Sequence, residues 1–162
     1  MKKVVLFAAL LVLSAGLVQT ASAQATATQT VNLSVGAIWR LTVSGNPGAL
    51  VAAGGVAGSD TVGTASDLTT SYSLTQNANN AARITAGTGS ALPAGLFLVT
   101  RLLSGRAQTA GYVDLSDGTT RNVITNIPFG ADRNNAIEYY FTAVASAGTF
   151  AGTRTVTLTL TN

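Results

Sequence analysis

The chain has 162 residues, of which only 9% are charged, and it contains no Cys and no His. Without Cys or His, the usual nucleophile–base pairs and most zinc sites cannot be built, so we expect no enzyme, no catalytic residues, no metal and no cofactor. The arginines lie singly along the chain, which provides no clustered basic face for nucleic acid. A disulfide-stapled fold is excluded as well.

The N-terminus has the pattern of a cleaved secretory signal. Lys2 and Lys3 precede an apolar run at residues 4–18, and small residues follow at 21–23 (Ala-Ser-Ala). We therefore predict a signal peptide at residues 1–23 and one exported domain at residues 24–162. Its destination would be the periplasm, the cell surface or the medium. The apolar run is too short for a membrane span, and we expect none in the mature chain.

Residues 31–43 give the clearest strand pattern. Apolar residues occupy the odd positions and mostly polar residues the even positions, which is the period of a β-strand with one buried face. The segment is one long strand or two strands with a bend at Gly36. It is either the ordinary first strand of the domain or a strand donated to a neighbouring chain. The odd positions are Val31, Leu33, Val35, Ala37, Trp39, Leu41 and Val43.

The rest of the chain also predicts strands. Residues 44–67 are rich in Gly, Ala and Ser, with at most a short edge strand at 50–53. No window has convincing helical periodicity, and turn residues separate the remaining segments. An all-β fold follows, an antiparallel β-sandwich. The predicted strands are 70–76, 82–86, 96–103, 112–115, 121–127, 136–144 and 154–161.

Few side chains suggest a binding site. Trp39 is best explained as a core residue, with sugar stacking as the alternative. Alternation in 136–144 directs Ile137, Tyr139 and Phe141 inward and Tyr140 outward, which makes Tyr140 a candidate contact for a glycan or a partner. Residues 114–118 have two aspartates, but this is the composition of a turn, and a calcium loop needs more oxygen ligands.

Several short segments resemble a known family. They are residues 72–77 (Tyr-Ser-Leu-Thr-Gln-Asn), 83–86 (Arg-Ile-Thr-Ala), 92–96 (Leu-Pro-Ala-Gly-Leu), 137–139, 148–150 and the Thr-rich end at 154–161. In these segments the chain is similar to bacterial secreted β-sandwich proteins of the spore-coat-U and archaic chaperone–usher pilin type. The resemblance implies an immunoglobulin-like fold that lacks one strand, assembly by strand donation, a periplasmic chaperone and an outer-membrane usher.

Two functional hypotheses remain. The first is a pilin-like surface subunit that assembles with other copies or other surface subunits. The alternative is a monomeric extracellular module that binds a glycan or another surface component through Tyr140. In the first hypothesis the donated strand supplies Val31, Leu33, Val35, Ala37 and Trp39, and the acceptor groove lies beside Val156, Leu158 and Leu160.

Overall fold

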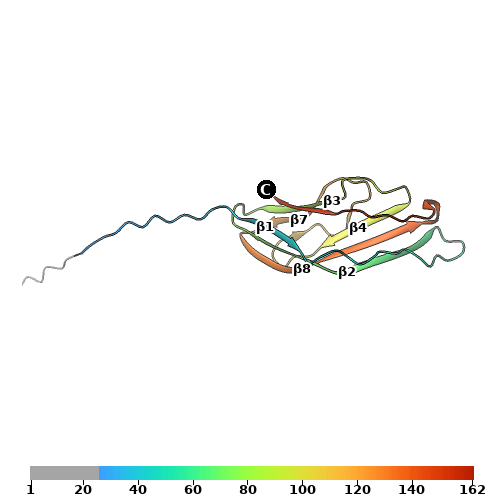
Figure 1. The fold of residues 1–162 in the computed structure, drawn as a ribbon, viewed down its shortest axis with the longest axis horizontal. Helices are drawn as coiled ribbons and strands as arrows, with labels where there is room; N and C mark the ends of the chain where they lie inside the picture. The colour runs from blue at the N-terminus through green and yellow to red at the C-terminus, as the bar shows by residue number, and fades with distance from the viewer. Residues whose placement is uncertain (1–25) are drawn as a thin grey trace, which may run out of the picture. The chain divides into compact units, whose positions relative to one another are not determined.

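The computed structural model describes residues 26–162, so the predicted signal peptide lies outside the described residues. The chain divides into two units at Ser34 and Val35. Residues 26–34 form no strand and their side chains are exposed. Residues 35–162 form a sandwich of two antiparallel sheets (Figure 1).

Nine strands and one short 3-10 turn make up this unit, and residues 26–162 contain no α-helix. The strands follow the chain as β1 (Trp39–Val43), β2 (Thr61–Gln76), β3 (Ala82–Gly87), β4 (Leu96–Leu102), β5 (Gln108–Thr109), β6 (Val113–Asp114), β7 (Arg121–Ile127), β8 (Gly130–Val144) and β9 (Thr157–Thr161), with the turn η1 (Ala145–Ala147) before β9.

The strand order matches an immunoglobulin-like sandwich with a position left open. One sheet has the order β1-β2-β8-β4-β6 and the other β5-β7-β3-β9. In the immunoglobulin fold, strands A, B, E and D face strands C, F and G. Here β1, β2, β8 and β4 take the places of A, B, E and D, while β3 and β9 take those of C and F. No strand within residues 26–162 occupies the place of G beside β9.

The core lies between the sheets and consists mainly of alternate residues of β2, β3, β4, β7 and β8. Two buried polar side chains inside it, Tyr72 and Gln76, are paired, as burial requires. The Tyr72 hydroxyl donates to the Leu103 carbonyl at 2.8 Å, and burial raises the Tyr72 pKa above its ordinary value. The fully buried Gln76 donates through Nε2 to the carbonyls of Asn79, Ile127 and Pro128.

The predicted all-β sandwich is confirmed, and the strand at 121–127 has the predicted bounds. Several other boundary predictions are wrong, and β5 was not predicted. The first strand covers only Trp39–Val43, and 50–53 is not a strand. Strand β2 begins at Thr61 instead of residue 70, and β9 begins at Thr157 instead of residue 154. Strand β8 begins at Gly130 instead of residue 136, so that the polar residues 132–135 lie inside it. Asn134 has a φ of 54°, and a local irregularity there lets the polar run continue the strand.

Candidate functional site

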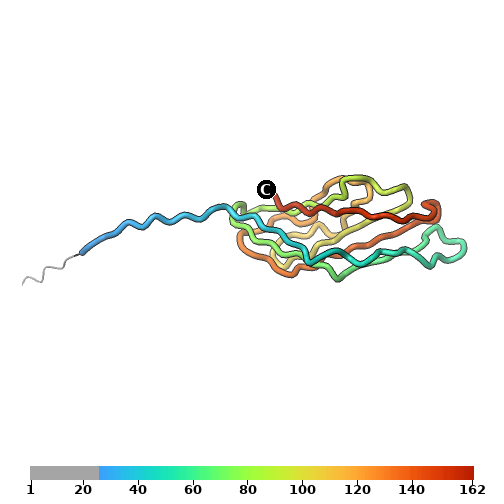
Figure 2. Tube along the Cα trace, viewed as in Figure 1, coloured from blue at the N-terminus to red at the C-terminus, as the bar shows by residue number. Residues whose placement is uncertain are grey.

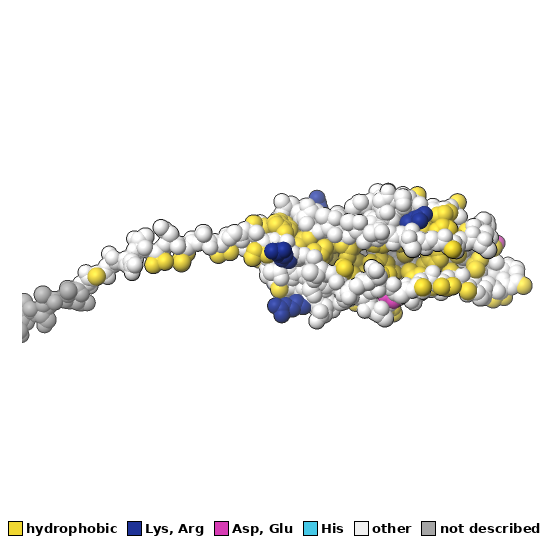
Figure 3. All heavy atoms as spheres, viewed as in Figure 1, with side chains coloured by type: hydrophobic (Ala, Val, Ile, Leu, Met, Phe, Trp, Pro, Cys, Tyr) yellow, Lys and Arg dark blue, Asp and Glu magenta, His cyan; other side chains and the backbone are white. Residues whose placement is uncertain are grey.

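The main hollow of the described chain is a groove of about 1290 Å³ between the edges of the two sheets. Strand β1 and residues 45–52 form one wall, and residues 148–156 with β9 form the other. Figure 3 shows hydrophobic side chains gathered along this hollow, and Figure 2 shows the two wall segments on either side of it. The groove therefore coincides with the place that strand G would fill.

The floor of the groove is the hydrophobic core itself. Leu98, Ile137 and Tyr139 line it and belong to the buried core. The wall side chains pack against this core but are only partly buried, since nothing in residues 26–162 covers them. They are Trp39, Leu41, Leu50, Val156, Leu158 and Leu160. A contiguous apolar surface of this kind marks an interaction site in a folded protein.

Both walls end in an unpaired strand edge. Within residues 26–162, strand β1 pairs only with β2, and β9 pairs only with β3. Each strand therefore presents a row of free backbone N–H and C=O groups toward the groove. Such edges are templates for another strand.

Polar contacts hold the wall segment 45–52 against β2. The backbone N–H of Gly48 donates to Asp67 Oδ2 at 3.0 Å. This bond and those from Thr69 hold the Asp67 pKa below its ordinary value. Farther along, Gly63 lies so close to Ala53 that a Cβ on Gly63 would be 2.6 Å from the Ala53 carbonyl oxygen. Residue 63 must therefore be glycine for the chain at Ala53, just after this wall segment, to lie so close to β2.

The opposite wall is an extended segment that leads into β9. Gly148, with a φ of 66°, closes η1 and starts this segment. The Arg154 guanidinium lies 5.9 Å from the centroid of the Phe150 ring, at the outer limit of a cation–π contact. Phe150 itself is 40% exposed and lines the groove.

The predicted assembly residues fall into two groups. Val31, Leu33, Val35 and Ala37 are exposed and lie outside any strand, and the exposed fractions of Leu33 and Val35 are 89% and 84%. Trp39 instead lies in β1 opposite Gln76, where it lines the groove. The three predicted groove residues Val156, Leu158 and Leu160 all line the hollow. Trp39 thus belongs to the wall of the groove.

Tyr140 lies on the outer face of the first sheet, away from the groove, and is only half-exposed. Its ring meets the 58%-exposed Tyr112 edge-on, with centroids 5.4 Å apart. Arg101 stacks on Tyr112 at 4.7 Å and forms a two-pronged ion pair with Glu138 at 2.7 and 2.8 Å. These Arg101 bonds hold the Glu138 pKa below its ordinary value. Hydrogen bonding with Tyr112, burial and the Glu138 charge raise the Tyr140 pKa to about 12.

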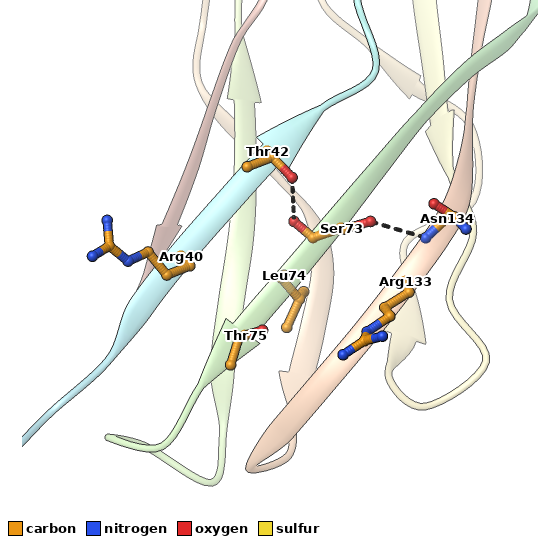
Figure 4. A pocket seen from close by; sticks show the side chains of 7 residues that line it. All are labelled: Arg40, Thr42, Ser73, Leu74, Thr75, Arg133 and Asn134. Carbon is orange, nitrogen blue, oxygen red and sulfur yellow. Dashed lines mark hydrogen bonds between the residues drawn. The ribbon is translucent and has the colours of Figure 1, made fainter. Parts of the chain in front are cut away.

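A second, smaller depression of about 320 Å³ lies over β1, β2 and β8 (Figure 4). Its polar contacts are local: Thr42 Oγ1 donates to the Ser73 carbonyl, and the Asn134 N–H donates to Ser73 Oγ. In Figure 4 the side chain of Arg40 points outward beyond β1, whereas that of Arg133 lies along β8. They do not converge on a common ligand position.

Comparison of the chain with protein-family models, with curated proteins and with solved structures gave no match. Within residues 26–162, no three side chains of His, Cys, Asp or Glu gather at one point. The same residues include no helix long and apolar enough to cross a membrane.

Sequence reasoning placed the groove beside the last strand but missed one of its walls. Residues 45–52 were predicted as a turn-rich stretch with a short edge strand. Their only sequence signal was Leu50 between small residues, and its partners lie far away along the chain.

Proposed function

We propose that this protein is a structural subunit of an exported surface assembly, built by strand donation between copies. The groove of one copy receives the N-terminal segment of another as the strand that its own sandwich lacks. The observation that supports this most strongly is the open groove, with core side chains on its floor and an unpaired strand edge on each side.

The N-terminal segment has the chemistry that the groove requires. Val31, Leu33 and Val35 alternate with Asn32 and Ser34, so an extended chain has one apolar face. Burying each apolar side chain would contribute about 1.5–3 kcal/mol before the cost of ordering the segment. The backbone would pair with the free edges of β1 and β9, which is the β-augmentation mode of recognition.

The segment also lacks charge. Residues 26–37 have exposed side chains and include no charged residue. A charge on this segment would be costly to bury in an apolar groove without a partner.

Export belongs to the same proposal, because residues 1–23 have the pattern of a secretory signal. An exported subunit with an open core groove needs protection from wrong pairing until assembly. A periplasmic chaperone that covers the groove is the corresponding partner.

The alternative, a glycan-binding module that uses Tyr140, has weaker support. The Tyr140 hydroxyl lies 3.3 Å from Glu138 Oε2 and its ring packs against Tyr112. These contacts explain the position of Tyr140 within a cluster of surface side chains, and no ligand is needed to explain it.

Trp39, the single Trp of the chain, supplies a native probe for the proposal. A variant lacking residues 26–35 should bind a synthetic peptide of residues 26–37. Because Trp39 lines the groove, its fluorescence should shift to shorter wavelength when the peptide covers it. The same peptide with Leu33→Asp is the matched control. Equal shifts with both peptides, or none with either, would contradict the proposal.

A further inference from the structure

Asn77 holds the residues that lead into β1. It follows the last residue of β2 and lies opposite Ile38. Its backbone N–H donates to the Ile38 carbonyl at 3.2 Å, and its Oδ1 accepts the Ile38 N–H at 2.6 Å. Its Nδ2 donates to the Gly36 carbonyl at 3.0 Å. Three hydrogen bonds thus keep residues 36–38 extended, in line with β1.

The position of Asn77 is itself fixed by its neighbour. Gln76 is fully buried, and its Oε1 accepts the N–H groups of Ala78 and Asn79 at 3.1 Å. Its Nε2 donates to three carbonyls, including that of Pro128 at 2.7 Å. The turn that presents Asn77 is therefore tied to the core.

A self-inserted strand that carries Leu33 into the groove would need a hairpin at this same place, because a turn at residues 33–34 takes Leu33 out of the inserted strand. The groove borders the edge of β1 that faces away from β2. Ile38 and Ser44 direct their backbone groups toward β2, since Asn77 N–H donates to Ile38 and Ser44 N–H donates to Ser71. Alternation then directs the backbone groups of odd-numbered residues, such as Trp39, toward the groove.

Two tight hairpins that keep Leu33 in the inserted strand and turn within residues 35–38 would pair with that edge. Their two-residue loops are 35–36 and 37–38. The first loop bends the backbone at Gly36, and the second bends it at Ile38. A longer loop that ends at Gly36 or at Ile38 also includes that residue. Each hairpin therefore breaks hydrogen bonds that Asn77 makes.

We infer that Asn77 is a positioning residue that directs the N-terminal strand to a second copy of this chain and away from its own groove. The inference rests on the proposed function, in which the partner is another copy, and it adds the residue that favours this partner over the chain's own groove. The Asn77 hydrogen bonds compete with a hairpin turn within residues 35–38, since the two cannot form together.

The test uses the full chain with two introduced cysteines, Leu33→Cys and Leu158→Cys. The chain has no Cys of its own, so a flexible bismaleimide joins only these two positions. Cross-links within one chain keep the monomer mass, whereas cross-links between chains give multimers. The parent should give multimers. Asn77→Ala should raise the ratio of intrachain to interchain product about tenfold, because it removes two hydrogen bonds.

Asn80→Ala is the matched control, because Asn80 is exposed and its side chain makes no hydrogen bond within residues 26–162. It should behave as the parent. Asn77→Asp keeps the acceptor for Ile38 and loses the donor to Gly36, so its ratio should fall between those of the parent and Asn77→Ala. This variant keeps the test decisive if Asn77→Ala does not fold.

The test distinguishes failure of the Asn77 role from failure of strand donation. An unchanged ratio in Asn77→Ala or Asn77→Asp, with cross-links present, overturns the role of Asn77 alone. General destabilisation would reduce both products and leave their ratio unchanged, so it gives that same negative result. Absence of any cross-link in the parent overturns the proposed strand donation and this inference with it.

Discussion

Leu33 is the residue on which strand donation depends most plainly. It is 89% exposed in the single chain and stands in the middle of the apolar alternation. Leu33→Asp places a charge where the proposal buries a side chain, and an unpaired buried charge is strongly unfavourable. We expect at least a tenfold loss of assembly, measured as the multimer fraction at a fixed protein concentration.

Asn32→Asp is the matched control for Leu33→Asp, because it adds the same charge to the opposite face of the segment. It should leave assembly within about twofold of the parent. Equal losses in the two variants would contradict the assignment of Leu33 to the groove.

Glu138 gives a prediction on stability that is separate from assembly. Hydrogen bonds from Arg101 hold its pKa below the ordinary 4.5 in the folded chain. The ion pair therefore stabilises the fold above about pH 4.5, and this contribution is lost as the pH falls through the lowered pKa. The exposed fractions of the two side chains, 31% and 11%, mean that solvent partly screens the pair.

Glu138→Gln should accordingly be less stable than the parent at neutral pH, and the difference should shrink in acid. Urea midpoints of both proteins across the acid range measure this. A difference that does not change with pH would contradict the ion-pair explanation, since it would arise from packing instead.

Among the elements, the wall segment 45–52 is followed by a close approach to β2, at Ala53 and Gly63. A Cβ at residue 63 would lie 2.6 Å from the Ala53 carbonyl oxygen and 3.0 Å from its nitrogen. Gly63→Ala should push this wall away from β2, with an expected cost of about 1–3 kcal/mol for overpacking. Assembly should weaken as well, because the groove changes shape.

Gly105→Ala is the control for Gly63→Ala, because a Cβ at residue 105 meets nothing within 4 Å. It should change the free energy of unfolding by less than about 0.5 kcal/mol. Denaturant titration and the multimer fraction measure the two effects. Normal assembly by a destabilised Gly63→Ala protein would contradict the role of this wall.

The elements also mark where sequence reasoning succeeded and where it failed. Strand β7 was predicted from a run of strand-forming residues between turn residues, and alternation identified the inward face of β8 at Ile137, Tyr139 and Phe141. The start of β2 at Thr61 was missed, since Gly63, Ala65 and Asp67 have low strand propensity and pairing with β8 decides the conformation.

The prediction of the first strand was wrong for a different reason. Residues 31–37 have a strand pattern, yet a pattern does not encode its partner, and the strand begins only at Trp39. The same argument explains the candidate site. The apolar face of β9 was predictable from Val156, Leu158 and Leu160, whereas the opposite wall depends on contacts distant in sequence.

For the molecule as a whole, the incomplete sandwich implies that stability and assembly are linked. A copy with an empty groove leaves core side chains such as Leu98 and Tyr139 lining an open hollow. A copy with a donated strand buries them further and pairs both free edges. Binding that favours only the folded state raises its stability by mass action, so assembled chains should resist heat and denaturant better than single ones.

The most direct test is the mass of the purified full chain in solution, measured by light scattering before and after heating in detergent. Strand donation predicts multimers that dissociate only on strong heating, and a variant lacking residues 26–35 that stays monomeric. A parent that remains at the mass of one chain at every concentration would contradict strand donation between copies.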